Sequence, residues 1–177
     1  MLTPPNLLTM LRIVLILPFG LLFFDGGLAT RWASLAVFLV ASATDWLDGH
    51  LARRLRQGSP LGRMLDPIAD KLLAATALVS LIATGAITRW SILAALAILL
   101  REIAVSGFRE HLGQIGVVVP VSALAKWKTA AQLVSLSLLI VPMDSVQPIG
   151  IALLWVASVL TLATGWSYLR ATLSAGR

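Results

Sequence analysis

Long apolar runs separated by short polar stretches make up nearly the whole chain. Six of these runs approach the length of about 20 residues that a helix needs to cross the hydrocarbon core of a membrane. They cover Leu7–Phe24, Trp32–Leu51, Ile68–Ala86, Trp90–Phe108, Trp127–Val141 and Pro148–Leu169. Polar or turn-forming stretches separate the runs, at 25–31, 53–62, 84–89, 109–120 and 143–147. The pattern predicts an all-α polytopic membrane protein with six transmembrane helices.

The composition agrees with a membrane environment. Of the 177 residues, 58% are hydrophobic and only 12% are charged, whereas ordinary globular domains carry about 25% charged residues. So small a polar fraction leaves too little polar surface to face water. Since the chain shows neither an internal repeat nor a low-complexity linker, we predict one membrane domain over residues 1–177.

The net charge of +6 is distributed as in a membrane protein. Basic residues gather at the ends of the apolar runs and form no stripe with interleaved aromatic residues, so we expect no nucleic-acid binding. With the N-terminus inside, the cytoplasmic side holds Arg53, Arg54, Arg56, Arg63, Arg109, Lys126 and Lys128. The opposite side holds only Arg31 and Arg89. The positive-inside rule therefore predicts both termini in the cytoplasm. We expect the membrane to be of the bacterial inner-membrane type.

Acidic residues are concentrated at the junction of the second and third runs. One helical face is expected to carry Asp45, Asp48, Gly49, Ala52 and Arg53, and the next to carry Gly62, Asp66 and Asp70. Offsets of three, four, seven and eight residues place side chains on one side of a helix. The intervening stretch 54–61 contains glycine and proline and reads as a turn. We expect the two helices to present their carboxylates to one another near the cytoplasmic end of the membrane.

Four ionised acids in a membrane need a counter-charge, because each costs at least ~2.5 kcal/mol on insertion scales. Protonation, Arg53 or Lys71 could supply part of the relief. Divalent cations supply more, because hard cations bind several carboxylate oxygens at once. The chain has no cysteine and His50 lies outside the acid pattern, so we predict Mg²⁺ or Mn²⁺. Two such ions ~3.5–4 Å apart are the usual arrangement for phosphoryl displacement.

Other residues of this region fit two interpretations each. The small residues Gly49, Ala52 and Gly62 permit either close helix approach or a flat ligand against the backbone. Arg53 could bind a phosphate with two parallel hydrogen bonds or could anchor the helix end at the lipid headgroups. Further candidates with two readings are Asn6, Thr9 and Arg12, which either border the site or pack the first helix. We expect Glu102 to pair with a neighbouring cation.

The combined motif Asp45-x-x-Asp48-Gly49-x-x-Ala52-Arg53, eight residues, then Gly62-x-x-x-Asp66-x-x-x-Asp70 resembles the signature of the CDP-alcohol phosphatidyltransferase family at every position. The resemblance implies a six-helix membrane fold, usually dimeric, with a site that faces the cytoplasm. It implies that Asp45, Asp48 and Asp66 ligate two metal ions and that Asp70 completes the cluster and acts as general base. It also implies a CDP site lined by Asp48, Gly49, Ala52, Arg53 and Gly62.

Stretches at 5–12, 44–49, 65–71 and 126–132 resemble the subfamily that joins CDP-diacylglycerol to glycerol 3-phosphate. A phosphorylated acceptor needs further cations, for which the candidates are Arg63, Arg101, Arg109, Lys126 and Lys128. The positive-inside rule explains the same residues without a substrate. Within the family, a phosphatidylinositol-phosphate synthase or a cardiolipin synthase are the alternatives. From a different class, the alternative is a cation carrier. A membrane prenyltransferase also uses Asp-rich metal sites, but it would not require Gly49, Ala52, Arg53 and Gly62 in this register.

Overall fold

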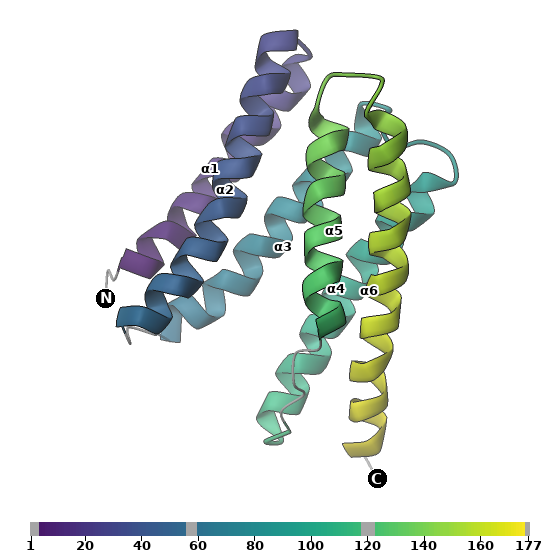
Figure 1. Ribbon diagram of the computed structural model, residues 1–177. Coiled ribbons are helices and arrows are strands. Elements are labelled where there is room, and N and C mark those ends of the chain that lie inside the picture. Colours follow the sequence, from purple (N-terminus) through teal and green to yellow (C-terminus); the bar gives the residue numbers. More distant parts are fainter. Residues whose placement is uncertain (1–3, 56–59, 118–122, 176–177) are drawn as a thin grey trace. The chain divides into compact units, whose positions relative to one another are not determined.

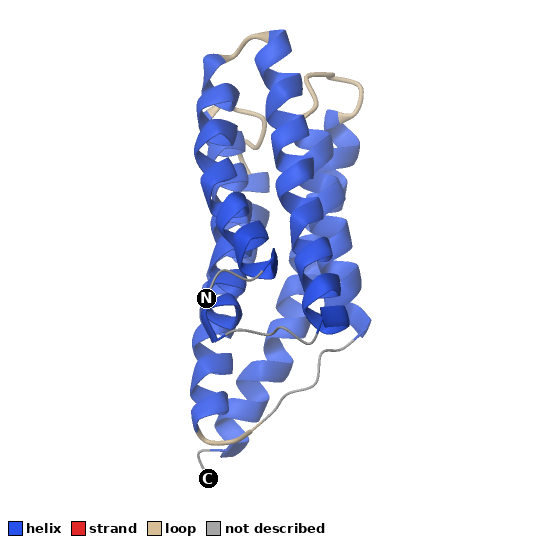
Figure 2. Cartoon of the chain, turned by 90° about the vertical axis from the view of Figure 1, so that its left-hand side faces the viewer, coloured by secondary structure: helices blue, strands red, loops and turns tan. Residues whose placement is uncertain are grey.

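The computed structural model describes residues 4–55, 60–117 and 123–175, without the side chains at 4–5, 46, 48–55, 60–61, 63, 171 and 174–175. Its helices are α1 (Pro4–Asp25), α2 (Leu28–Leu55), α3 (Pro60–Ala83), α4 (Ser91–Gln114), α5 (Ala123–Ile140) and α6 (Gln147–Ala175), as Figure 1 shows. The described residues contain no strand (Figure 2). The prediction of six helices in an all-α fold is confirmed.

Several helices extend beyond the apolar runs that predicted them. Helix α3 begins at Pro60 instead of Ile68, and α4 continues past Phe108 to Gln114. Hydropathy marks only the apolar part of a helix, whereas its backbone hydrogen bonds continue through polar residues. Proline suits the first turn, where its missing N–H has no partner to lose. The connections predicted at 53–62 and 109–120 were therefore too long, and Arg109 lies on a helix.

Within the described parts of the chain, three helices are apolar and long enough to cross a membrane, over Asn6–Asp25, Ser91–Gln114 and Gln147–Arg170. Helices α2 and α3 carry the acids and their flanking basic residues, and α5 has only 18 residues. A polar helix face is tolerated in a bilayer when it points into a bundle. The chain is a membrane protein, and crossings by α2, α3 and α5 stay a prediction.

The chain divides into two compact units. The first comprises Met1–Ala86 and Leu139–Val146, and the second comprises Ile87–Leu138 and Gln147–Arg177. The acid motif belongs to the first unit, and four of the five candidate acceptor cations belong to the second. The prediction of one domain over the whole chain stays a prediction.

In the first unit, α1 packs along both α2 and α3 (Figure 1). The ring of Phe19 on α1 lies 5.8 Å from that of Phe23 and 5.8 Å from that of Phe38 on α2, measured between ring centroids. All three rings are buried. The hydroxyl of Ser34 on α2 donates to the backbone oxygen of Phe19 at 3.4 Å. Helix α1 therefore joins the two helices that carry the acids.

In the second unit, α4 packs along α6. Val105 and Leu112 of α4 form a buried cluster with Tyr168 of α6, and Phe108 packs against it. The buried hydroxyl of Ser135 on α5 donates to the backbone oxygen of Gly150 on α6 at 2.8 Å. These contacts hold the basic ends of α4 and α5 on a common scaffold with α6.

Candidate active site

The acid motif is helical, as predicted. Asp45 lies on α2, and Gly62, Asp66 and Asp70 follow at intervals of four along α3. Gly62 is buried, Asp66 is half-buried, and Asp45 and Asp70 are exposed. Five of the predicted site residues lie outside the part of the structure whose side chains are described: Asp48, Gly49, Ala52, Arg53 and Arg63. Their predicted roles therefore stay predictions.

Arg12 of α1 contacts the first acid of the motif. Its Nη1 atom lies 2.9 Å from Oδ1 of Asp45 on α2, and Arg12 is fully buried whereas the Asp45 side chain is 49% exposed. The Nε–H of Arg12 donates to the hydroxyl of Thr44 at 3.4 Å. The guanidinium thus reaches two successive residues of α2. A carboxylate that is buried on one side by an arginine and open on the other is poised to meet a further cation.

Thr9, one turn earlier on α1, contacts an acid of the other helix. Its hydroxyl donates to Oδ1 of Asp66 on α3 at 2.5 Å, and Thr9 is buried. Residues three apart on a helix lie on the same side, so Thr9 and Arg12 project together. One side of α1 therefore touches one carboxylate from α2 and one from α3.

The donor set fits hard divalent cations. Aspartate oxygens are ligands that Mg²⁺ and Mn²⁺ prefer, and the chain has no cysteine to favour a softer metal. A carboxylate offers about four lone-pair sites, so a contact with α1 leaves capacity for a metal ion on Asp45 and Asp66. Among the described side chains, no three acids or histidines gather closely enough to hold an ion. Asp48, the acid that would complete such a group, is not among them.

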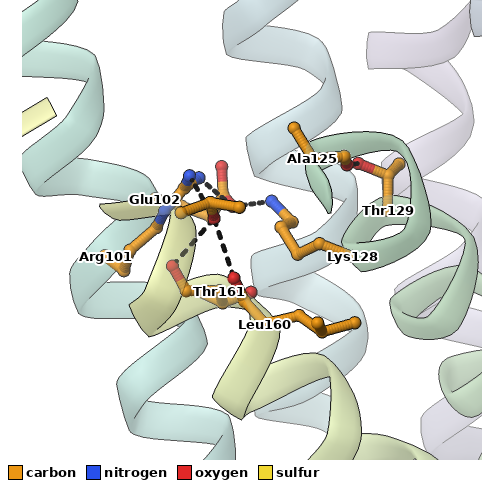
Figure 3. A network of polar contacts seen from close by, with 8 residues as sticks. Arg101, Glu102, Ala125, Lys128, Thr129, Leu160 and Thr161 are labelled. Atoms are coloured by element: carbon orange, nitrogen blue, oxygen red, sulfur yellow. Dashed lines mark hydrogen bonds and ion pairs between the residues drawn. The ribbon is translucent and has the colours of Figure 1, made fainter. Parts of the chain in front are cut away.

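The second unit holds a polar cluster that spans three helices (Figure 3). Glu102 of α4 forms ion pairs through Oε1 with Lys128 of α5 and, at 3.1 Å, with Nη1 of Arg101. Lys128 is buried and Glu102 is half-buried. The expectation that Glu102 pairs with a neighbouring cation is confirmed. The structure also brings together two of the predicted acceptor cations, Arg101 and Lys128.

Helix α6 supplies the other side of this cluster. Nη2 of Arg101 donates to the hydroxyl of Thr164 at 2.8 Å. The side chain of Arg101 also lies against Gly165, where an added Cβ would come within 3.0 Å of Cγ and 3.4 Å of Nε. Nε of Arg101 and the hydroxyl of Thr161 are buried without a hydrogen-bond partner among the described residues. Such atoms mark a place where a water or a substrate oxygen could bind.

The remaining candidate cations are less constrained. The guanidinium of Arg109 lies 5.9 Å from the ring centroid of Tyr168, a cation–π contact, and Arg109 is exposed. Lys126 is exposed in the first turn of α5. Both side chains are accessible to a solute, but the structure assigns neither an acidic partner among the described residues.

The sequence did not single out Thr164 and Gly165, because the sixth apolar run is generic in composition. It left Thr9 and Arg12 with two interpretations. Arg12 carried a usable signal, since an ionisable residue within an apolar span is a functional candidate by default and calls for a partner. Only the packing of α1 against α2 and α3 identifies Asp45 and Asp66 as the acids that Arg12 and Thr9 contact.

Comparisons with known proteins place these residues in context. A family model described as CDP-alcohol phosphatidyltransferase matches residues 2–163. A protein of Cereibacter sphaeroides named CDP-diacylglycerol–glycerol-3-phosphate 3-phosphatidyltransferase is 36% identical, over 96% of this chain and 95% of that protein. Its namesake in Pseudomonas fluorescens is 44% identical, over 94% of this chain and 88% of that protein. A third protein of this name, from Rickettsia bellii, is 39% identical over 94% and 93% of the two chains. The matched family is generally metal-dependent.

Proposed function

Because this chain belongs to the CDP-alcohol phosphatidyltransferase family, we propose that it transfers the phosphatidyl group of CDP-diacylglycerol to glycerol 3-phosphate. The products are phosphatidylglycerophosphate and CMP, a step of phospholipid biosynthesis. The observation that carries the proposal is similarity to proteins named for this reaction, at 36% and 44% identity over at least 94% of the chain. On this reading the enzyme is a phosphatidylglycerophosphate synthase.

Two divalent ions, Mg²⁺ or Mn²⁺, are held in this proposal by Asp45, Asp48, Asp66 and Asp70. When bound, such ions neutralise the pyrophosphate of the lipid and the charge that develops on departing CMP. The all-oxygen donor set supports this choice of metal. The cytidine diphosphate lies against a second group of motif residues, Asp48, Gly49, Ala52, Arg53 and Gly62. A buried Gly62 is consistent with a close approach of ligand or helix at that point.

Asp70 is the proposed general base. Its exposure on α3 supports this role, since a base must reach the hydroxyl of an incoming substrate. Asp70 takes the proton from the primary hydroxyl of the acceptor, and the oxygen attacks the phosphorus that bears diacylglycerol. The bond from that phosphorus to the oxygen of CMP breaks in the same displacement. Arg53 steadies the pyrophosphate with paired N–H donors. The reaction needs no covalent enzyme intermediate.

The phosphate of the acceptor is assigned to Arg101 and Lys128, with Arg63, Arg109 and Lys126 as further contributors. Two cations share the single carboxylate of Glu102, which leaves a net positive charge at that cluster. A net positive charge with unused donors favours a phosphate ester over a neutral alcohol. The buried and unpartnered Nε of Arg101 supports the same assignment.

The proposed setting is a bacterial-type inner membrane, crossed several times, with both termini and the active site facing the cytoplasm. Large apolar residues such as Val14, Leu17 and Leu21 are exposed on α1, which supports contact with acyl chains. The lipid substrate enters sideways from the inner leaflet. We further propose that the enzyme is a homodimer, as its family usually is.

The test is CMP release by the purified protein in lipid nanodiscs with CDP-diacylglycerol, Mg²⁺ or Mn²⁺, and labelled acceptors. We expect release with glycerol 3-phosphate, and none after the divalent ions are removed with a chelator. Release with inositol phosphate alone would instead identify a phosphatidylinositol-phosphate synthase. Release with phosphatidylglycerol alone would identify a cardiolipin synthase. A protein that releases no CMP with any acceptor would refute the proposal.

A further inference from the structure

Arg12 is a charged residue in the interior of the most apolar helix of the first unit. It lies within the span Asn6–Asp25, and no part of it is exposed. A guanidinium at such a position is retained only when other groups compensate for its lost hydration. The residues that contact Arg12 therefore show which groups compensate for its lost hydration.

The contacts of Arg12 form an ordered chain of donors and acceptors on α2. The hydroxyl of Thr44 donates its proton to the backbone oxygen of Ala41 at 2.6 Å, which turns a lone pair of the hydroxyl toward Arg12. Nε–H of Arg12 donates to that hydroxyl, and Nη1 pairs with Asp45. The planar guanidinium holds Nε and Nη1 in one rigid plane. The hydrogen bond to Thr44 thus orients the guanidinium, whose Nη1 forms the ion pair with the carboxylate of Asp45.

Thr9 makes the equivalent contact with α3. It is buried one turn from Arg12, and its hydroxyl donates to Oδ1 of Asp66. The two acids come from different helices, and Figure 1 shows α1 alongside both of them. A single helix therefore sets the position of one carboxylate from each half of the acid motif.

We propose that α1 is the positioning element of the metal cluster, with Arg12 orienting Asp45 and Thr9 orienting Asp66. The inference rests on the proposed function, in which both acids ligate divalent cations. Hydrogen-bonded partners of metal ligands orient those ligands, and replacing such a partner typically lowers metal affinity about 10- to 100-fold. Arg12 and Thr9 are positioning residues, because in this proposal they act on the metal ions through Asp45 and Asp66.

An electrostatic role for Arg12 predicts a different outcome from a positioning role. A positive charge beside Asp45 opposes a divalent cation, so loss of charge alone would strengthen metal binding. Arg12→Lys retains the charge and loses the planar fork that joins Thr44 to Asp45. A positioning role therefore predicts that the lysine variant binds the metal more weakly, whereas a purely electrostatic role predicts binding like that of the wild type.

The experiment is a titration of the purified full-length protein in nanodiscs with Mn²⁺ alone, followed by electron paramagnetic resonance of the free ion. We expect Arg12→Lys and Arg12→Gln to raise the Kd for Mn²⁺ about tenfold or more. Arg31→Lys is the matched control. Arg31 is a half-buried arginine of the same unit that lies 4.2 Å from the ring of Phe23 and donates to the backbone oxygen of Leu139 at 3.5 Å. Its variant should bind Mn²⁺ like the wild type.

Thr9 provides a second pair of variants, which keeps the test decisive if the Arg12 variants do not fold. Thr9→Val removes the hydroxyl donor at nearly constant volume and should raise the Kd for Mn²⁺. Thr9→Ser keeps the hydroxyl and should have the Kd of the wild type. The inference would be overturned if the folded Arg12 variants bound Mn²⁺ with the affinity of the wild type. It would also be overturned if Thr9→Val and Thr9→Ser both did so. The titration needs no substrate, so it remains informative if the wild type releases no CMP. Conversely, if the wild type releases CMP but the variants bind Mn²⁺ like the wild type, the positioning role is overturned and the proposed function stands.

Discussion

Glu102 of α4 and Lys128 of α5 form an ion pair within the second unit, and the same carboxylate oxygen also accepts Arg101. Lys128 thus meets, at one carboxylate, a pair of residues that lie 26 or more positions earlier in the chain. The pair ties α5 to α4, while the bond from Arg101 to Thr164 ties α4 to α6. A cluster that joins three helices in this way should affect both stability and the binding of the acceptor.

Removal of the shared carboxylate should destabilise the second unit. In Glu102→Gln, Lys128 keeps its charge with only 9% of its side chain exposed. Leaving one partner of a buried pair without its counter-charge costs about 3 kcal/mol, at the low end because Glu102 is partly exposed. Chemical unfolding in detergent measures this change. The control is Glu110→Gln, an exposed acid on the same helix, which should change stability by less than about 0.5 kcal/mol. Equal effects of the two variants would contradict the structural role of Glu102.

Gly165 should tolerate no side chain. In Gly165→Ala the new Cβ meets Cγ of Arg101 at 3.0 Å and displaces it from Thr164. Gly107→Ala on α4 is the matched control, because nothing lies within 4 Å of its added Cβ. Both variants gain helix propensity, so their difference in unfolding free energy, about 1–3 kcal/mol, isolates the overpacking. The KM for glycerol 3-phosphate should rise in Gly165→Ala and stay unchanged in Gly107→Ala. An unchanged KM in Gly165→Ala would show that Arg101 does not contribute to acceptor binding.

Asp70→Asn should abolish turnover and largely spare binding. The amide cannot accept the proton of the acceptor hydroxyl, so kcat should fall by about 10²- to 10⁴-fold. Binding of Mn²⁺ and of CDP-diacylglycerol, measured in the same nanodiscs, should largely remain, because Asp45, Asp48 and Asp66 still supply carboxylates to the metal. Asp144→Asn changes an exposed acid between α5 and α6 and should leave kcat as it is. Retained turnover in Asp70→Asn would exclude Asp70 as the base.

Arg109→Ala and Lys126→Ala should weaken binding of the acceptor more than that of the lipid. Each removes an exposed cation, and loss of a charge-assisted contact to phosphate raises KM about tenfold or more. Initial rates of CMP release, with each substrate varied in turn, separate the two constants. Arg89→Gln, on the predicted opposite side of the membrane, serves as the control for net charge. An effect on the KM for CDP-diacylglycerol alone would move these cations from the acceptor to the lipid.

The orientation in the membrane can be tested with single cysteines, since the chain has none. Thr88→Cys lies between α3 and α4, and Gln114→Cys lies at the end of α4. Both positions are exposed. A membrane-impermeant maleimide added to intact cells should label the cysteine at 88 and leave the one at 114 unlabelled. The reverse pattern would place both termini outside.

Helix number, helix type and the acid motif could be predicted from sequence because they depend on local properties. A run of apolar residues defines a span, and the spacing of Gly62, Asp66 and Asp70 defines one side of a helix without reference to the rest of the chain. Helix ends were less predictable. The continuation of α4 to Gln114 involves Leu112, which packs against Tyr168 far along the sequence.

The sequence by itself determined that this chain is a membrane protein of six helices with an acid motif on the second and third. It also supports the proposal of hard divalent cations, since aspartates without cysteine favour them. Only the tertiary structure decided which residues meet: Arg12 with Asp45, Thr9 with Asp66, and Glu102 with both Arg101 and Lys128. The physical reason is that spacing along a helix fixes which side chains share a face. The partner opposite that face depends on how helices pack, and packing is decided by contacts between residues distant in the chain.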